Sequence, residues 1–111
     1  MDKFDVLRKY FGYSSFRKGQ EEMVDCLLSG RDALGIMPTG AGKSICYQVP
    51  AIMFGGVTIV VSPLISLMKD QVNALVQQGV KAAYINSSLT DTQYDKVLKN
   101  AALGIYKIIY V

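Results

Sequence analysis

The chain has 111 residues, half of them hydrophobic, and a formal net charge of +3. This length suffices for one domain with a real core, and no apolar run approaches the roughly 20 residues that a membrane-spanning helix needs. The charged start MDKFDVLRKY is not a secretory signal, and the absence of histidine excludes a histidine-based catalytic triad and a zinc site within this chain.

Two helices are expected in the first 30 residues. The apolar residues in the range 3–11 have helical spacing, and Gly12 is expected to end this first helix. Apolar positions between residues 23 and 28 define the second helix, which Gly30 is expected to cap. The N-terminal part of the chain is therefore predicted to be helical.

A phosphate-binding loop is predicted at residues 37–44, MPTGAGKS. Gly40 and Gly42 have no Cβ, so the backbone can bend tightly and bring successive N–H groups close to an anion. Lys43 can reach the β- and γ-phosphates of a nucleotide, and the Ser44 hydroxyl can bind Mg²⁺. The helix that follows adds its positive N-terminal end to the same site.

The segments around the loop have the order that this motif requires. An apolar strand is expected at 33–37 and a helix from about 43 to 53. Beyond them we expect a strand covered on both faces at 57–61, followed by a long helix ending at Gly79. A strand at 82–85 and a strand at 106–111 are expected on either side of a helix at about 91–103. That helix is expected to start with a capping box of Thr90 and Gln93. This alternation predicts an α/β fold with a parallel, doubly wound sheet whose ligands bind beyond the C-terminal strand ends.

The cysteines and the net charge are weak guides to function. Cys26 and Cys46 are expected to be buried free thiols of a reducing compartment. A net charge of +3 permits a nucleic-acid partner but does not indicate one.

Two further segments have side chains suited to ligands. In GYSSFRKGQ, residues 12–20, an aromatic ring can stack on a base, and the Gln20 amide suits the N6/N7 edge of adenine. Taken alone, this segment is better explained by Phe16 as a core residue and Arg17 as the start of a helix. In SPLISLMKDQV, residues 62–72, a helix N-terminus offers N–H groups to a phosphate. Taken alone, it is better explained as an amphipathic helix with a solvated face.

Together, GYSSFRKGQ, MPTGAGKS and SPLISLMKDQV resemble the start of the RecQ family of superfamily-two DNA helicases, from about Leu7 to Val111. The usual first glycine of the phosphate loop is Met37 here, and the loop of that family commonly begins Met-Pro-Thr. Lys18 and Ala41 stand where the family often has Pro and Gly, which leaves the resemblance intact. It implies one truncated domain, with N-terminal helices in 1–31 and a partial RecA-like, P-loop NTPase sheet flanked by helices in 32–111.

The resemblance also implies roles, position by position. Adenine would be held and read by Tyr13, Arg17 and Gln20. ATP and Mg²⁺ would be bound by Thr39, Gly40, Ala41, Gly42, Lys43 and Ser44, with Lys43 and Ser44 as catalytic residues and Ser44 on the metal. Single-stranded DNA would contact Ser62, Pro63, Leu64, Lys69 and Gln71. The implied parent is an ATP-dependent helicase that moves 3′ to 5′ along DNA in the bacterial cytoplasm.

The acidic motif II of that family, its second motor domain and its arginine finger have no counterpart in these 111 residues. Phosphoryl transfer needs a carboxylate for the metal and a group that positions water, and no expected strand here ends in Asp-Glu. We therefore expect the chain by itself not to hydrolyse ATP or unwind DNA. In RecA-like sheets the strand that carries motif II and the strand after it lie between the strands that correspond to 33–37 and 57–61, so the resemblance also implies a gap between these two. The chain would then re-pair its strands, exchange elements with a second copy or fold poorly.

Two other classes remain open. Another P-loop NTPase or a kinase would need an acidic residue at a strand end, and it leaves the segment 62–72 unexplained. A non-catalytic nucleotide- or DNA-binding module would share the loop without the reaction. Titrations with ATP and with single-stranded DNA, compared with Lys43→Ala, separate these classes.

Overall fold

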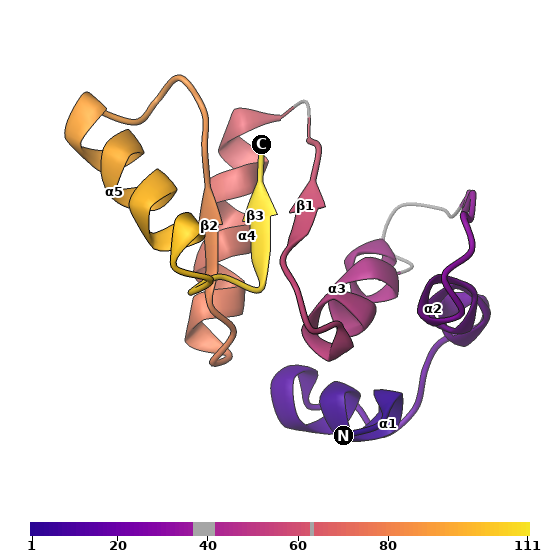
Figure 1. The fold of residues 1–111 in the computed structure, drawn as a ribbon. Helices are drawn as coiled ribbons and strands as arrows, with labels where there is room; N and C mark the ends of the chain where they lie inside the picture. The colour runs from indigo at the N-terminus through magenta and orange to yellow at the C-terminus, as the bar shows by residue number, and fades with distance from the viewer. Residues whose placement is uncertain (37–41, 63) are drawn as a thin grey trace. The chain divides into compact units, whose positions relative to one another are not determined.

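The computed structural model describes residues 1–36, 42–62 and 64–111. The chain divides into two compact units, Met1–Gly55 and Gly56–Val111 (Figure 1). The predicted single domain, divided at residue 31, stays a prediction.

The first unit is helical throughout its described regular structure. It contains α1 (Lys3–Val6), a π-helix η1 (Leu7–Phe11), α2 (Gln20–Leu28) and α3 (Lys43–Met53). The helix predicted over 3–11 is confirmed, although its second half is wound as a π-helix. Gly12 follows with a φ of 75°, a left-handed conformation that glycine adopts without steric cost. The bounds of α3 match the prediction of 43 to 53.

The core of this unit lies where α1, η1, α2 and α3 meet. Val6, Leu7, Val24 and Val49 are at most 1% exposed, and partly buried apolar side chains surround them. α3 packs against both α1 and α2. The predicted apolar faces of the two N-terminal helices therefore form this core, and their packing holds the start of α2 near the start of α3.

The strand predicted at 33–37 is wrong for its described part. Residues 33–36 have no regular secondary structure, and the side chains of Leu34 and Ile36 are 89% and 90% exposed. An apolar run forms a strand only where a neighbouring strand bonds its backbone, and no described strand pairs with this segment. Met37 lies outside the described residues.

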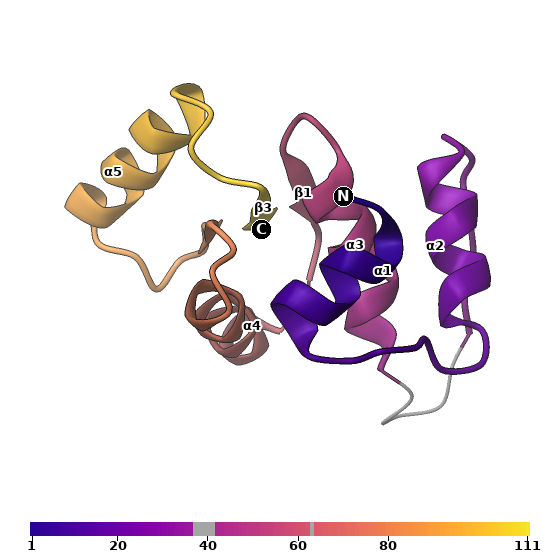
Figure 2. The same ribbon diagram turned by 90° about the horizontal axis from the view of Figure 1, so that it is seen from below.

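The second unit is an α/β layer structure. It contains β1 (Thr58–Val60), α4 (Ile65–Gln77), β2 (Ala82–Tyr84), α5 (Asp91–Ala102) and β3 (Ile108–Tyr110). The strands form a parallel sheet in the order β1-β3-β2, and Ile108 is in register with both Thr58 and Ala82. α4 and α5 lie on opposite sides of the sheet (Figure 2), as right-handed crossovers require when the chain reverses direction across the sheet. The predicted parallel α/β sheet flanked by helices is confirmed, with three described strands in place of the four expected.

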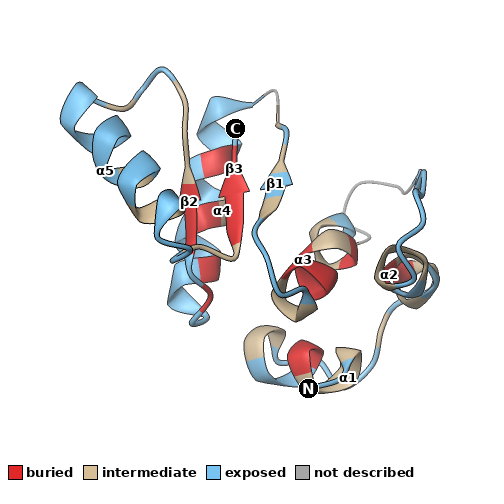
Figure 3. Cartoon of the chain, in the orientation of Figure 1, coloured by how far each residue is buried: buried red, intermediate tan, exposed pale blue. Residues whose placement is uncertain are grey.

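The core of the second unit is formed by β3 and the inner face of α4. All three residues of β3 are buried (Figure 3), and Met68, Val72 and Leu75 of α4 are 1–6% exposed. These helical residues are spaced i, i+4, i+7, the pattern of an amphipathic helix on a sheet. None of the helices in the described part of the chain is both long and apolar enough to cross a membrane.

The prediction that the strand at 57–61 is covered on both faces is wrong. β1 is shorter, and Val57, Ile59 and Val61 are 51%, 53% and 82% exposed. β1 pairs with β3 along one edge, and no described strand pairs with its other edge. A continuous apolar run indicates burial on both faces only when the strand lies inside its sheet.

The capping box predicted for α5 is confirmed. The Thr90 hydroxyl accepts a bond from the Gln93 N–H at 3.2 Å, and the Gln93 side chain accepts from the Thr90 N–H at 2.9 Å. Two donors that the helix itself cannot satisfy are thereby bonded.

The prediction of two buried thiols holds for one of them. Neither cysteine forms a disulfide, but Cys26 is only half-buried, and its Sγ donates to the carbonyl of Asp32 at 3.6 Å. Cys46 is buried, and this burial raises the pKa of its thiol. Helical spacing alone does not distinguish the centre of a core from its margin.

Candidate nucleotide-binding site

A pocket in the first unit collects the side chains predicted to read adenine. Its lining residues come from two separate segments: Tyr13, Ser15, Arg17 and Gln20 from the first, and Gly42 and Ile45 from the second. All three predicted adenine contacts therefore lie beside Gly42, near the end of the predicted phosphate loop. Packing of α2 against α3 produces this arrangement, which brings together residues more than 20 positions apart.

Gln20 is the structural centre of this pocket. Although polar, its side chain is 2% exposed. Its Oε1 accepts a bond from the Arg17 N–H at 2.7 Å, and its Nε2 donates to the carbonyl oxygen of Gly42 at 3.0 Å. A buried amide needs such partners, because an unsatisfied one would lose its hydrogen bonds with water without replacement.

Gly42 has a conformation and an environment that only glycine suits. Its φ is +74°, and a Cβ placed on it would lie 2.5 Å from Gln20 Nε2. The backbone therefore approaches the Gln20 side chain so closely that a Cβ at position 42 would displace the Gln20 amide. Two physical features thus favour glycine at position 42 of the predicted loop: its left-handed φ and its close packing against Gln20.

The start of α3 is suited to an anion. Gly42 occupies the N-cap position, and none of the described side chains caps the helix, whose first N–H groups have no intrahelical partner. Lys43 is exposed and Ser44 half-buried in the first turn. An uncapped helix start next to a lysine and a hydroxyl fits the phosphates and Mg²⁺ of a nucleotide. The predicted contacts Thr39, Gly40 and Ala41 lie outside the described residues.

The two aromatic residues of the segment 12–20 have different roles. Phe16 is half-buried and packs against Phe4, with ring centroids 5.6 Å apart, so it belongs to the core. Tyr13 lines the pocket and is 50% exposed, which leaves its ring accessible for stacking. Sequence reasoning missed Ser15 and Ile45 as lining residues, because their types and spacing are those of an ordinary turn and helix.

The predicted DNA contacts lie in the second unit, around the end of β1 and along α4. The Leu64 N–H donates to Ser62 Oγ at 3.4 Å, and Leu64 is the N-cap of α4, which no side chain caps. Lys69 is exposed and Gln71 half-buried. Residues two apart on a helix do not face the same direction, so these two side chains cannot form one contact surface. Pro63 lies outside the described residues.

Comparison with known proteins identifies relatives of this chain. Residues 17–111 match the DEAD/DEAH box helicase family. An ATP-dependent DNA helicase RecQ from Pasteurella multocida is 56% identical over 107 residues, which are 96% of this chain and 17% of that protein. The RecQ helicase of Bacillus subtilis is 52% identical over 107 residues, covering 96% of this chain and 18% of the relative. The ATP-dependent helicase wrn-1 from Caenorhabditis elegans is 41% identical over 99 residues, covering 89% and 9%. The chain thus spans less than a fifth of the length of these relatives.

Proposed function

Because the chain belongs to the DEAD/DEAH box helicase family, we propose that it carries the nucleotide-binding part of a RecQ-type ATP-dependent DNA helicase. The observation that carries the proposal is the bond from Gln20 Nε2 to the Gly42 carbonyl. This contact joins the segment suited to a base with the start of the helix suited to phosphates. A pocket for a base and a site for a triphosphate are therefore adjacent, as ATP requires.

The base is assigned to the pocket at Gln20. An amide offers one donor and one acceptor together, which matches the N6/N7 edge of adenine and mismatches guanine. Tyr13 provides the ring for stacking, and Arg17 provides a cation at the rim. ATP should therefore bind more tightly than GTP.

The phosphates are assigned to residues 39–44. Lys43 neutralises the β- and γ-phosphates, the first N–H groups of α3 donate to phosphate oxygens, and Ser44 holds Mg²⁺. Thr39, Gly40 and Ala41 complete the loop in this proposal. ATP with Mg²⁺ supplies the phosphoanhydride whose hydrolysis drives movement in the whole helicase.

The DNA strand is assigned to the second unit. The uncapped start of α4 and the exposed Lys69 support a contact with backbone phosphates. Ser62, Pro63 and Leu64 complete this proposed surface, along which the whole helicase moves 3′ to 5′. Gln71, which faces another side of α4, is a separate proposed contact with the strand. We expect the 111 residues alone to bind ATP without hydrolysing it, because none of the described strands leads into an Asp or Glu.

Calorimetric titration of the 111-residue chain with ATP and Mg²⁺ tests the proposal. Lys43→Ala should abolish ATP binding and leave the binding of a single-stranded oligonucleotide unchanged. Lys96→Ala removes the same charge from an exposed position of α5 and should change neither. A wild-type chain that binds neither ligand would refute the proposal, and ATP binding without DNA binding would refute the assignment of the DNA strand to the second unit.

A further inference from the structure

We propose that Lys3 is a positioning residue of the nucleotide site, which together with Phe4 holds the turn from Arg17 to Gln20 in the conformation that recognises the base. The inference rests on the proposed function for the identity of the ligand. Its geometry involves only contacts within the first unit.

The turn to be held is closed by two reciprocal hydrogen bonds. The Arg17 N–H donates to Gln20 Oε1 at 2.7 Å, and the Gln20 N–H donates to the Arg17 carbonyl at 3.0 Å. Gln20 is also the first residue of α2, whose N-cap is Gly19 and therefore has no capping side chain. A helix start without a side-chain cap frays easily, so the direction of the Gln20 amide depends on other contacts.

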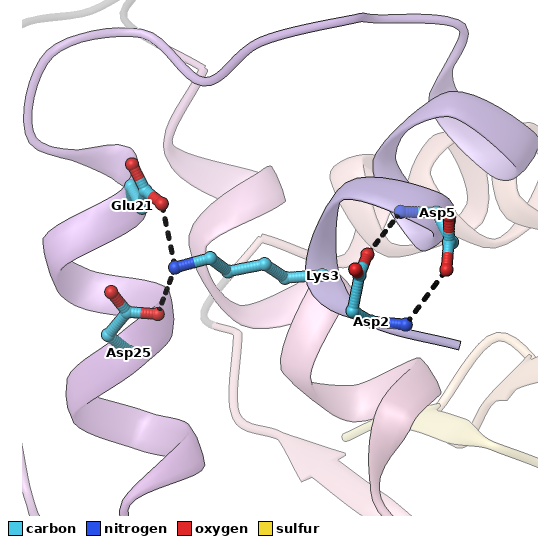
Figure 4. Close-up of polar contacts among 5 residues, drawn as sticks. All are labelled: Asp2, Lys3, Asp5, Glu21 and Asp25. Atoms are coloured by element: carbon cyan, nitrogen blue, oxygen red, sulfur yellow. Dashed lines mark hydrogen bonds and ion pairs between the residues drawn. The ribbon is translucent and has the colours of Figure 1, made fainter.

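Lys3 provides such a contact at one end of the turn. Its Nζ lies 2.7 Å from Glu21 Oε2 and 2.6 Å from Asp25 Oδ1 (Figure 4). Glu21 follows Gln20 directly, and Asp25 lies one helical turn further on the same face. The lysine side chain is only 18% exposed, so it is more confined than an ordinary surface lysine. One cation thus fixes the first two turns of α2.

Phe4 provides a contact at the other end. Its ring lies 5.6 Å from that of Phe16, the residue just before Arg17. Lys3 and Phe4 are consecutive, so one short segment of α1 contacts the chain on both sides of the Arg17–Gln20 turn. These two contacts bracket the hydrogen-bonded turn that carries the base-reading amide.

The segment that bears Lys3 is itself fixed. Asp2 Oδ1 accepts a bond from the Asp5 N–H at 2.9 Å, and Asp5 Oδ2 accepts from the Asp2 N–H at 3.1 Å (Figure 4). Val6 and Leu7 then anchor α1 and η1 in the core at 1% exposure. Lys3 therefore links the start of α2 to a segment that is anchored in the core.

The test compares Lys3→Met with Arg8→Met in the 111-residue chain. Methionine keeps the apolar stem and removes the charge. Arg8 pairs with Asp5 on its own helical segment at 2.8 Å, so its replacement removes the same charge without removing a described ion pair to α2. Lys3→Arg serves as the conservative variant that should restore the ion pairs.

Comparing ATP with inorganic tripolyphosphate, which has no base, separates an effect on base recognition from an effect on phosphate binding. We expect Lys3→Met to weaken ATP binding by roughly two- to fivefold, the range of a partly exposed ion pair, and to leave inorganic tripolyphosphate binding unchanged. Arg8→Met and Lys3→Arg should bind both ligands like the wild type. Unchanged ATP binding in Lys3→Met, an equal loss in Arg8→Met, or an equal loss for tripolyphosphate would each overturn the inference.

The contacts of Lys3 and Phe4 on the two sides of the Arg17–Gln20 turn are called the clamp. Amide hydrogen exchange without ligand tests the clamp independently of the proposed function. In Lys3→Met the Arg17 N–H should lose protection, because its acceptor is on Gln20, whereas Arg8→Met should leave it unchanged. Unchanged protection in Lys3→Met overturns the inference. If the wild type bound no ATP, the proposed function would fail, while loss of Arg17 protection would still support the clamp.

Discussion

Replacement of Gly42 by alanine is the sharpest test of how the pocket is built. Two costs are expected. The first is the left-handed conformation at φ +74°, which costs an alanine about 1–2 kcal/mol. The second is steric, because the new Cβ would lie 2.5 Å from Gln20 Nε2 and the amide would have to move away.

Movement of the Gln20 amide removes its bond to the Gly42 carbonyl and disturbs the bond from the Arg17 N–H. Each such bond contributes about 1 kcal/mol in a buried site. The total for Gly42→Ala is therefore about 2–4 kcal/mol. ATP binding should fall at the same time, because the displaced amide no longer faces the base.

Gly12→Ala is the matched control. Gly12 has nearly the same φ, +75°, but a Cβ there would have no neighbour within 4 Å. It should cost only the conformational penalty of about 1–2 kcal/mol. The difference between the two variants isolates the contact with Gln20.

The assay is native-state amide exchange at Val24 and Val49, which lie in the core of the first unit and report its stability separately from the second. Nucleotide affinity is measured on the same samples by calorimetry. Equal destabilisation by Gly42→Ala and Gly12→Ala, with ATP affinity retained in both, would refute the described packing of Gly42 on Gln20.

Three further predictions concern features outside this contact. Thr90→Ala should destabilise α5 by about 1 kcal/mol in amide exchange through loss of its capping box, while Thr92→Ala, at an exposed helical position, should cost much less. Ile59→Lys should reduce self-association in sedimentation experiments without unfolding the chain, because no described strand pairs with the outer edge of β1 and Ile59 is 53% exposed. The expected self-association is contradicted if the wild type sediments as a monomer at every concentration. The bond from the Asp2 N–H lowers the pKa of Asp5. The stability that Asp5 contributes is therefore present above its ordinary pKa near 3.8 and is lost as the pH falls below that value. Asp5→Asn should remove this part of the acid dependence in a pH titration followed by circular dichroism.

Patterns that depend on neighbours along the chain were predicted well. The bounds of α3, the capping box of α5 and the glycine after η1 follow from helical periodicity, local hydrogen bonds and the φ that glycine permits. Each involves residues within a few positions of one another. Such features are determined by the same sequence segment that displays them.

The strands show where local patterns fail. Residues 33–36 and 57–61 are both apolar, yet the first is not a strand and the second has an exposed edge strand at its centre. Whether an apolar run forms a buried strand depends on a partner that is distant in the sequence. Three parallel strands find partners in the second unit, and the run at 33–36 has none among the described strands.

The sequence by itself determined the helices, the parallel α/β class and the residue types of a phosphate loop, because spacing and side-chain chemistry are properties of short segments. Only the tertiary structure decided that Gln20 meets Gly42, that Tyr13 lines the pocket while Phe16 joins the core, and that Lys3 bonds the start of α2. Those contacts join residues far apart in the chain, and the packing of one helix against another is what brings them within reach.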